Sequence, residues 1–236
     1  MIIGINGYAG SGKDTVGTII QYLQADTNIP LKGVLNKTPH HIWWLEERSG
    51  WEIKKWAGKL KDIASLLTGI PVESFEDQEF KKTLLGPEWG TVTLNPLNSI
   101  PVFSDIQFNS LMSVREFLQK LGTDAIRDGL HTNAWVNALM AGYKPGPFYP
   151  DVAIEKHAKL PNWIITDTRF PNEAQAIKDK GGIVIRVDRP GVKPINDHPS
   201  EVGLEDWKFD YKIANVSDIK ALSLSVRIIL EKENML

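Results

Sequence analysis

The residues best suited to chemistry form a glycine-rich segment near the start of the sequence. Residues 7–13 read GYAGSGK and fit the G-x-x-x-x-G-K part of the Walker A motif. In such a loop the glycines let successive backbone N–H groups point at phosphate oxygens, and Lys13 adds a positive charge. Asp14 stands where Ser or Thr is usual, and Thr15 follows it. A carboxylate at this position can bind Mg²⁺ directly or through water, and Thr15 can donate to a phosphate oxygen.

The same letters could also form an ordinary glycine turn that happens to end in lysine. The surrounding sequence argues against this alternative, because an apolar strand-like run over 1–6 precedes the loop. An amphipathic helix from Lys13 to about Asp26 follows it, with apolar residues at helical spacing. We therefore predict that the loop binds the triphosphate of ATP. The residues predicted to do so are Gly10, Ser11, Gly12, Lys13, Asp14 and Thr15.

Arginines at the ends of predicted elements favour an anionic phosphate acceptor. Arg115 opens a predicted helix and Arg127 lies beyond it, while Arg169 and Arg189 follow predicted strands. Phosphoryl transfer to a hydroxyl usually requires a base, whereas transfer to an existing phosphate requires relief of charge repulsion by Arg, Lys and Mg²⁺. Any one of these arginines could instead be an ordinary surface or ion-paired residue. Together they indicate an acceptor that already carries a phosphate.

A second acidic site follows the apolar run over 163–166. Asp167 stands at the end of this predicted buried strand, where Walker-B-like carboxylates organise Mg²⁺. Asp14 and Asp167 are therefore the predicted metal residues. Glu173 lies four residues after Arg169, so the two could form a pair or hold a substrate together. A helix-capping Asp and an ordinary ion pair are the alternative interpretation.

Strands that alternate with helices predict a parallel, doubly wound sheet and a three-layer α/β/α fold of the P-loop NTPase type. Strands are expected over 1–6, 51–56, 163–166, 182–187 and 211–214, and helices over 13–26, 58–68, 113–121, 133–143, 172–180 and 218–232. Residues 28–50 lack a clear period, and Gly122 is expected to end the helix that precedes it.

The expected organisation is a single kinase-type domain over 1–236 with an insertion. Residues 86–110 contain Gly86, Pro87, Gly90, Pro96 and Pro101, which exclude a long regular element. We expect this stretch to form a lobe or lid over the acceptor site.

The composition argues against several classes of protein. The formal net charge of −2 argues against stable nucleic-acid binding, and the absence of cysteine excludes disulfides and thiolate metal sites. No apolar run approaches the roughly 18 residues of a membrane span. Met1 leads directly into a strand rather than a secretory leader. The expectation is a cytoplasmic protein that binds small molecules.

Several segments together resemble the bacteriophage-type deoxynucleoside monophosphate kinase family. They are GYAGSGKDT (7–15), WAGKLKD (56–62), LQKLGTD (118–124), AWVNALM (134–140), ITDTRFPNEA (165–174) and VDRPG…NDHPSE (187–201). The segments occur in the family's order and span nearly the whole chain. The resemblance implies transfer of the γ-phosphoryl group of ATP to a deoxynucleoside 5′-monophosphate with Mg²⁺. It also implies a homodimer and, for a phage protein, a location in the host cytoplasm.

The resemblance also implies roles for individual residues. Those implied for the acceptor site are Lys61, Arg115, Gly122, Thr123 and Trp135, with Asp167, Arg169 and Glu173 completing the centre between acceptor and ATP. The residues implied to act in catalysis are Lys13, Asp14, Arg115, Asp167 and Arg169. Asn215, after the last strand, is a candidate adenine contact. His198, Ser200 and Glu201 match a family segment to which the residues alone assign no role.

Two other functions fit the same phosphate loop. One is another small-molecule kinase, such as a dephospho-coenzyme A or phosphomevalonate kinase. The other is a non-catalytic protein that uses ATP binding as a switch. A switch protein would keep the phosphate loop but would need neither Arg115 nor Arg169.

Overall fold

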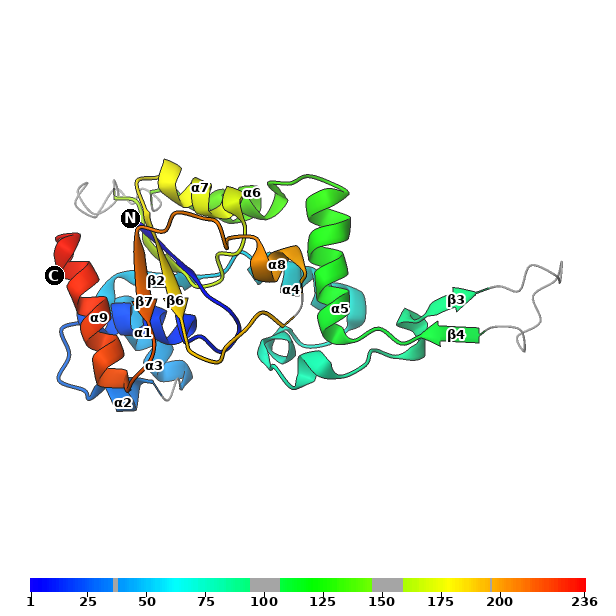
Figure 1. Ribbon diagram of the computed structural model, residues 1–236, viewed down its shortest axis with the longest axis horizontal. Helices are drawn as coiled ribbons and strands as arrows, with labels where there is room; N and C mark the ends of the chain where they lie inside the picture. Colours follow the sequence, from blue (N-terminus) through cyan, green and yellow to red (C-terminus); the bar gives the residue numbers. More distant parts are fainter. Residues whose placement is uncertain (36–37, 94–106, 146–158, 196) are drawn as a thin grey trace, which may run out of the picture. The chain divides into compact units, whose positions relative to one another are not determined.

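A five-stranded parallel sheet forms the centre of the larger part of the computed structural model (Figure 1). Its strands are β1 (Ile2–Asn6), β2 (Trp51–Lys54), β5 (Asn162–Ile165), β6 (Ile183–Asp188) and β7 (Tyr211–Ala214). They run in the order β2-β5-β1-β6-β7, and every pair is parallel. Because β1 lies in the middle, the chain winds outward from it in both directions. The predicted doubly wound parallel sheet is therefore confirmed.

The structure describes residues 1–35, 38–93, 107–145, 159–195 and 197–236. They fall into two compact units. Unit 1 contains the sheet and comprises residues 1–56 and 135–236, and unit 2 comprises residues 57–134.

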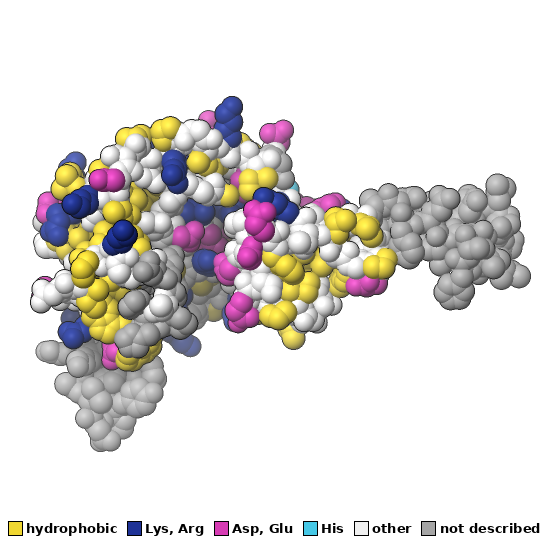
Figure 2. Space-filling model, turned by 90° about the horizontal axis from the view of Figure 1, so that it is seen from below, with side chains coloured by type: hydrophobic (Ala, Val, Ile, Leu, Met, Phe, Trp, Pro, Cys, Tyr) yellow, Lys and Arg dark blue, Asp and Glu magenta, His cyan; other side chains and the backbone are white. Residues whose placement is uncertain are grey.

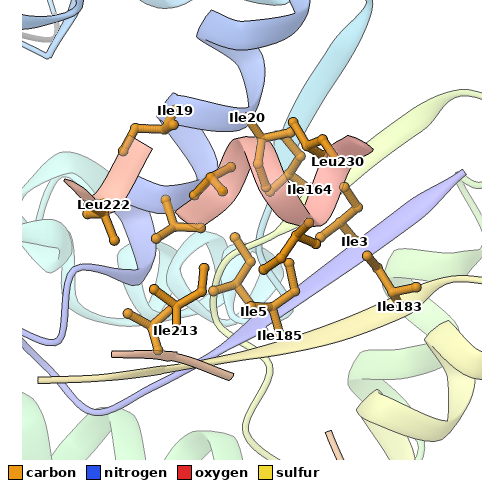
Figure 3. Packing of buried hydrophobic residues seen from close by; sticks show 14 of the residues in the cluster. Ile3, Ile5, Ile19, Ile20, Ile164, Ile183, Ile185, Ile213, Leu222 and Leu230 are labelled. Atoms are coloured by element: carbon orange, nitrogen blue, oxygen red, sulfur yellow. The ribbon is translucent and has the colours of Figure 1, made fainter. Parts of the chain in front are cut away.

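Helices cover both faces of the sheet in unit 1. On one face α1 (Lys13–Gln24) and α9 (Ile219–Lys232) pack against the strands, and Figure 3 shows Ile20 of α1 and Leu230 of α9 close to Ile164 of β5. On the other face α6 (Ala134–Met140) and α7 (Pro171–Asp179) bury their apolar side chains. The strands read as near-continuous apolar runs, as expected for strands covered on both faces. The predicted three-layer α/β/α fold is confirmed.

Among the described residues of unit 1, three α-helices were not expected from the sequence. Two of them, α2 (Leu31–Val34) and α3 (Pro39–Ser49), occupy the stretch that lacks a clear period. Burial of Val34 and Leu45 against Ala25 stabilises them. Pro39 is the first residue of α3, where a proline is tolerated, so it begins a helix rather than breaking one. The third, α8 (Pro199–Val202), is a single turn that also begins with proline.

Unit 2 consists of short elements around a small core. Its elements are α4 (Gly58–Thr68), η1 (Val72–Glu76), η2 (Phe80–Lys82), η3 (Pro87–Trp89), β3 (Thr91–Thr93), β4 (Gln107–Ser110), α5 (Val114–Gln119) and the π-helix η5 (Lys120–Asp128). Phe75, Leu85 and Phe117 are buried in its centre. β3 and β4 pair antiparallel within the expected insertion, whose residues 94–106 lie outside the described residues.

Gly122 does not end a helix, contrary to the prediction. It lies inside η5, which continues directly from α5. A Cβ atom on Gly122 would lie 2.8 Å from Cδ2 of Leu60. The glycine therefore permits close packing of η5 on α4 instead of a turn.

Figure 2 shows lysine and arginine side chains dispersed among hydrophobic and uncharged ones over the surface that it displays. Within the described ranges, none of the helices has the length and apolar character that crossing a membrane requires.

Candidate active site

The phosphate loop connects the end of β1 to the start of α1. Gly10 and Gly12 have φ angles of 83° and 97°, in the left-handed region that favours glycine. Ser11 donates its N–H to the Tyr8 carbonyl (3.1 Å), which closes the turn. Gly12 is the N-cap of α1, so the loop ends at a helix N-terminus with N–H groups available for an anion. The hydroxyl of Ser11 is buried and has no hydrogen-bond partner among the described residues.

Asn215 supports this loop from the end of β7. Its Nδ2 donates to the Ser11 carbonyl (2.9 Å), and its N–H donates to the Asp188 carbonyl (2.7 Å). A Cβ atom on Gly12 would lie 2.6 Å from Nδ2 of Asn215, so only glycine fits there. Asn215 thus fixes the phosphate loop. Its contact with adenine stays a prediction.

Asp14 is held by a residue that was not predicted from the sequence. The hydroxyl of Thr166 donates to Oδ1 of Asp14 (2.8 Å), and Thr166 is fully buried. Nζ of Lys13 lies 3.8 Å from Oδ2 of the same carboxylate. The only available signal for Thr166 was its place directly after β5, the strand next to β1.

Charged groups from three strand ends act on Lys13. Burial lowers the pKa of Lys13 from 10.5, Asp14 and Asp167 oppose this shift, and Arg169 and Lys55 add to it. Asp14, Asp167 and Arg169, all predicted from the sequence, are therefore close enough to Lys13 to influence its pKa. Lys55 was not predicted, although it follows β2 at the same edge of the sheet.

The turn after β5 is tied to two neighbouring segments. Oδ1 of Asp167 accepts the N–H of Trp56 (2.8 Å), and the indole of Trp56 donates to the Thr168 hydroxyl (3.3 Å). Asn6, the last residue of β1, donates to the Thr168 carbonyl (2.7 Å). These bonds fix the backbone that carries Asp167 beside the phosphate loop.

Arg169 and Glu173 are both held in place, but by different contacts. The carboxylate of Glu173 accepts the N–H groups of Arg169 (2.8 Å) and Phe170 (3.1 Å), so it caps the first turn of α7. Nη1 of Arg169 donates to Oε1 of Glu201 (2.7 Å) and to the Ser200 carbonyl (3.0 Å). Glu173, rather than the Asp of the alternative interpretation, thus caps α7, and the ion-pair partner of Arg169 is Glu201.

The remaining predicted acceptor residues belong to two units. Lys61 is buried in unit 2 and forms an ion pair with Glu76, and Arg115 donates to Oε1 of Gln78 (3.1 Å). Gly122 and Thr123 lie buried in η5 of the same unit. Trp135 lies in unit 1, where its side chain is buried. The roles of these residues toward an acceptor stay predictions.

Comparison with known proteins finds sequence similarity along most of the chain. A family model described as deoxynucleotide monophosphate kinase matches residues 81–226, more than half of the chain. The deoxynucleoside-5′-monophosphate kinase of Escherichia phage T5 is 28% identical over 254 residues, which cover 96% of this chain and 94% of that protein.

Two further relatives match over part of their length. A protein of Acanthamoeba polyphaga mimivirus, named as a candidate deoxynucleotide monophosphate kinase, is 36% identical over 115 residues, covering 45% of this chain and 55% of that protein. The deoxynucleotide monophosphate kinase of Enterobacteria phage T4 is 30% identical over 116 residues, covering 49% of this chain and 44% of that protein.

Proposed function

Because the chain belongs to the deoxynucleotide monophosphate kinase family, we propose that it transfers the γ-phosphoryl group of ATP to a deoxynucleoside 5′-monophosphate. The products are ADP and a deoxynucleoside diphosphate. The observation that supports this proposal most strongly is the gathering of Asp14, Asp167 and Arg169 around Lys13 of the phosphate loop. Anion-binding groups and carboxylates suited to Mg²⁺ thus meet at one edge of the sheet.

The proposed reaction is an in-line displacement on the γ-phosphorus. The N–H groups of the loop and the ammonium of Lys13 bind the β- and γ-phosphates and stabilise the charge that spreads over the transferred group. The acceptor phosphate is already an anion and attacks without a general base. Arg169 is proposed to bind that phosphate and reduce its repulsion from ATP, and Arg115 of unit 2 stays a predicted acceptor residue.

The residues of unit 1 fit a Mg²⁺ ion bound together with ATP. Carboxylate oxygens from Asp14 and Asp167 are donors that Mg²⁺ prefers, and it commonly takes one or two of them together with substrate phosphates. The buried Ser11 hydroxyl supplies a further oxygen beside the loop. When bound, Mg²⁺ would neutralise phosphate charge. The protein's part is to hold Asp14 through Thr166 and Asp167 through the N–H of Trp56.

The decisive experiment measures ADP release from Mg²⁺·ATP with one acceptor in each reaction. The acceptors are dAMP, dGMP, dCMP, dTMP, 5-hydroxymethyl-dCMP, AMP and dephospho-coenzyme A. Turnover with one or more deoxynucleotides, abolished in Asp14→Asn, is expected. Turnover with dephospho-coenzyme A alone would instead establish the alternative kinase, which the family does not favour.

A second experiment addresses the switch function. Arg169→Ala should greatly reduce turnover and leave ATP binding nearly intact. A non-catalytic ATP-responsive protein would show no turnover in either form, and its response to ATP would be little affected by Arg169→Ala. Retention of full turnover by Arg169→Ala would remove Arg169 from the proposed site.

We further propose that the protein is a homodimer in the cytoplasm that binds ATP and a deoxynucleotide rather than nucleic acid. Light scattering after size-exclusion chromatography will test the dimer, for which a mass of twice 26.4 kDa is expected.

A further inference from the structure

The segment around α8 has no role in the site described so far, yet it contains a carboxylate that is almost completely buried. The side chain of Glu201 is 5% exposed. A carboxylate is rarely buried to this extent without a charged partner. Its partner is Nη1 of Arg169, 2.7 Å from Oε1, and the Ser200 carbonyl accepts from the same nitrogen at 3.0 Å.

Local hydrogen bonds constrain the segment around Glu201. His198 is the N-cap of α8, because its Nδ1 accepts the N–H of Ser200 (3.2 Å) and lies 2.8 Å from the Ser200 hydroxyl. The N–H of Glu201 donates to the His198 carbonyl (2.7 Å). At the other end of α8, a Cβ atom on Gly203 would lie 3.0 Å from the carbonyl oxygen of Arg169. α8 therefore packs directly against the turn that carries Arg169.

Arg169 is consequently fixed at three points. Glu173 accepts its N–H, α8 packs on its carbonyl, and Glu201 with Ser200 binds Nη1. Nε and Nη2 make no hydrogen bond to the described residues, and the side chain is 34% exposed. Two donor nitrogens of a held guanidinium thus stay available, and a phosphate is the ligand that such a planar donor edge fits best. The positive charge of Arg169 also acts on Lys13 of the phosphate loop.

We propose that Glu201 is a positioning residue, which holds Arg169 in the orientation that binds substrate phosphate before the substrate arrives. The proposal rests on the proposed function, in which Arg169 contacts a phosphate. It assigns a role to the His198–Glu201 segment: the cap and the single turn of α8 exist to present one buried carboxylate to Arg169. Because the guanidinium is already oriented, less conformational entropy is lost when the phosphate binds.

The kinetic test compares Glu201→Ala with Glu201→Gln. Alanine removes the partner of Nη1, and kcat/KM for the deoxynucleotide should fall on the order of 10–100-fold, as expected when a misplaced group must be reoriented. KM for ATP should change less than about twofold. Glutamine keeps an oxygen at nearly the same place, so it should recover most of the loss. Lys178→Ala is the matched control, because it removes an ion pair of the same 2.7 Å length from α7.

A double-mutant cycle separates positioning from simple stabilisation. If Glu201 acts through Arg169, then Glu201→Ala should lower kcat/KM by less than about twofold in the Arg169→Ala background. An undiminished loss in that background would overturn the proposal. So would a Glu201→Ala protein with lowered thermal stability but wild-type kcat/KM. Should the alanine variant fail to fold, Glu201→Asp keeps the charge and withdraws the carboxylate, and a loss of about tenfold is expected.

A binding experiment decides the proposal even if the proposed function fails. With ADP present at saturating concentration to occupy the phosphate loop, inorganic phosphate is titrated calorimetrically into the wild type, Glu201→Ala and Lys178→Ala. Binding at least tenfold weaker in Glu201→Ala alone supports the positioning role, whether or not the wild type phosphorylates a deoxynucleotide. Equal affinities in all three proteins overturn it. Absence of turnover with every deoxynucleotide would overturn only the proposed function.

Discussion

At two positions of the site, the carboxylate and the hydroxyl of a common hydrogen bond have changed places. In common P-loop NTPases the residue after the loop lysine is a hydroxyl residue, and the acidic partner comes from a neighbouring strand. Here Asp14 provides the carboxylate on α1, and Thr166 provides the hydroxyl at the end of β5. The same kind of hydrogen bond forms with its partners exchanged. Asp14 was predicted from the sequence. The contact of Thr166 with Asp14 became evident only from the positions of α1 and β5 in the structure.

Thr166→Val tests whether this hydrogen bond orients Asp14 for Mg²⁺. Valine keeps the shape of a fully buried side chain and removes only the donor to Asp14. By analogy with second ligand shells of metals, kcat should fall about 10–100-fold, and the Mg²⁺ concentration for half-maximal activity should rise. Thr166→Ser, which keeps the hydroxyl, should stay within a few-fold of wild type. Equal kinetics of the valine and serine variants would show that the hydroxyl has no such role.

The ionisation of Lys13 predicts how nucleotide binding changes with pH. Its pKa lies below 10.5, chiefly because of burial. Affinity for metal-free ADP should therefore be constant at moderately alkaline pH, where the terminal phosphate is fully ionised. As the pH rises further, the affinity should begin to fall before pH 10.5 is reached, because the ammonium of Lys13 loses its proton. Calorimetric titrations over this range will locate the fall.

Two variants should move this fall in opposite directions. Asp14 raises the pKa of Lys13 and Lys55 lowers it. Asp14→Asn should therefore shift the fall in affinity to lower pH, and Lys55→Gln should shift it to higher pH. Shifts of the same sign in both variants would contradict this account of Lys13.

Elements with a clear apolar period were predictable, and those that depend on distant contacts were not. The prediction for residues 58–68 coincides with α4, and that for 211–214 coincides with β7. The helices α2 and α3 were not predicted, because a small hydrophobic cluster around Val34 and Leu45 stabilises them. They lack a long face of apolar residues at helical spacing. Gly122 was misread because its close neighbour, Leu60, comes from a different helix.

The packing of α1 on β5 predicts a contrast between two glycines of unit 1. A Cβ atom on Gly17 in α1 would lie 2.8 Å from Cγ2 of Thr166, whereas one on Gly33 in α2 would meet only an ordinary contact at 3.8 Å. Alanine gains about 1 kcal/mol of helix propensity at either site. Overpacking costs about 1–3 kcal/mol at Gly17 only.

Gly17→Ala should therefore lower the free energy of unfolding by about 1 kcal/mol, whereas Gly33→Ala should leave it unchanged or raise it. Urea denaturation followed by tryptophan fluorescence will measure both. An increase in stability for Gly17→Ala as large as that for Gly33→Ala would mean that α1 can move away from β5 at little cost.

At the scale of the whole molecule, the site of unit 1 is assembled from the carboxyl ends of all five parallel strands. β1 leads into the phosphate loop, β5 into Asp167 and β2 into Lys55. β6 leads to Arg189, which donates to the Gly10 carbonyl (3.4 Å), and β7 leads to Asn215. A parallel sheet makes this convergence predictable from sequence, because all its strands end at one edge. The strand order, which sets the neighbours of each residue, was not predictable.

Since these segments meet only in the folded chain, nucleotide should bind the folded state and raise its stability. At a free concentration of about 100 times Kd, the gain is about 2.7 kcal/mol. For a protein of this size it corresponds to a rise in Tm of roughly 5–10 °C. Differential scanning calorimetry with ADP and Mg²⁺ will measure the rise, and chelation of Mg²⁺ by EDTA should reduce it.

Asp14→Asn distinguishes the stabilisation that comes from Mg²⁺ from the stabilisation that comes from nucleotide binding to the phosphate loop. Its carboxylate lies beside the phosphate site, so without Mg²⁺ it repels the nucleotide, and with Mg²⁺ it is proposed to bind the ion. In EDTA the variant should therefore gain at least as much stability from ADP as the wild type does. Added Mg²⁺ should raise the Tm of the wild type further but have little effect on that of the variant. A Mg²⁺-dependent rise of equal size in both proteins would place the ion at Asp167 and the phosphates alone, and Thr166 would then orient a carboxylate that the metal does not use.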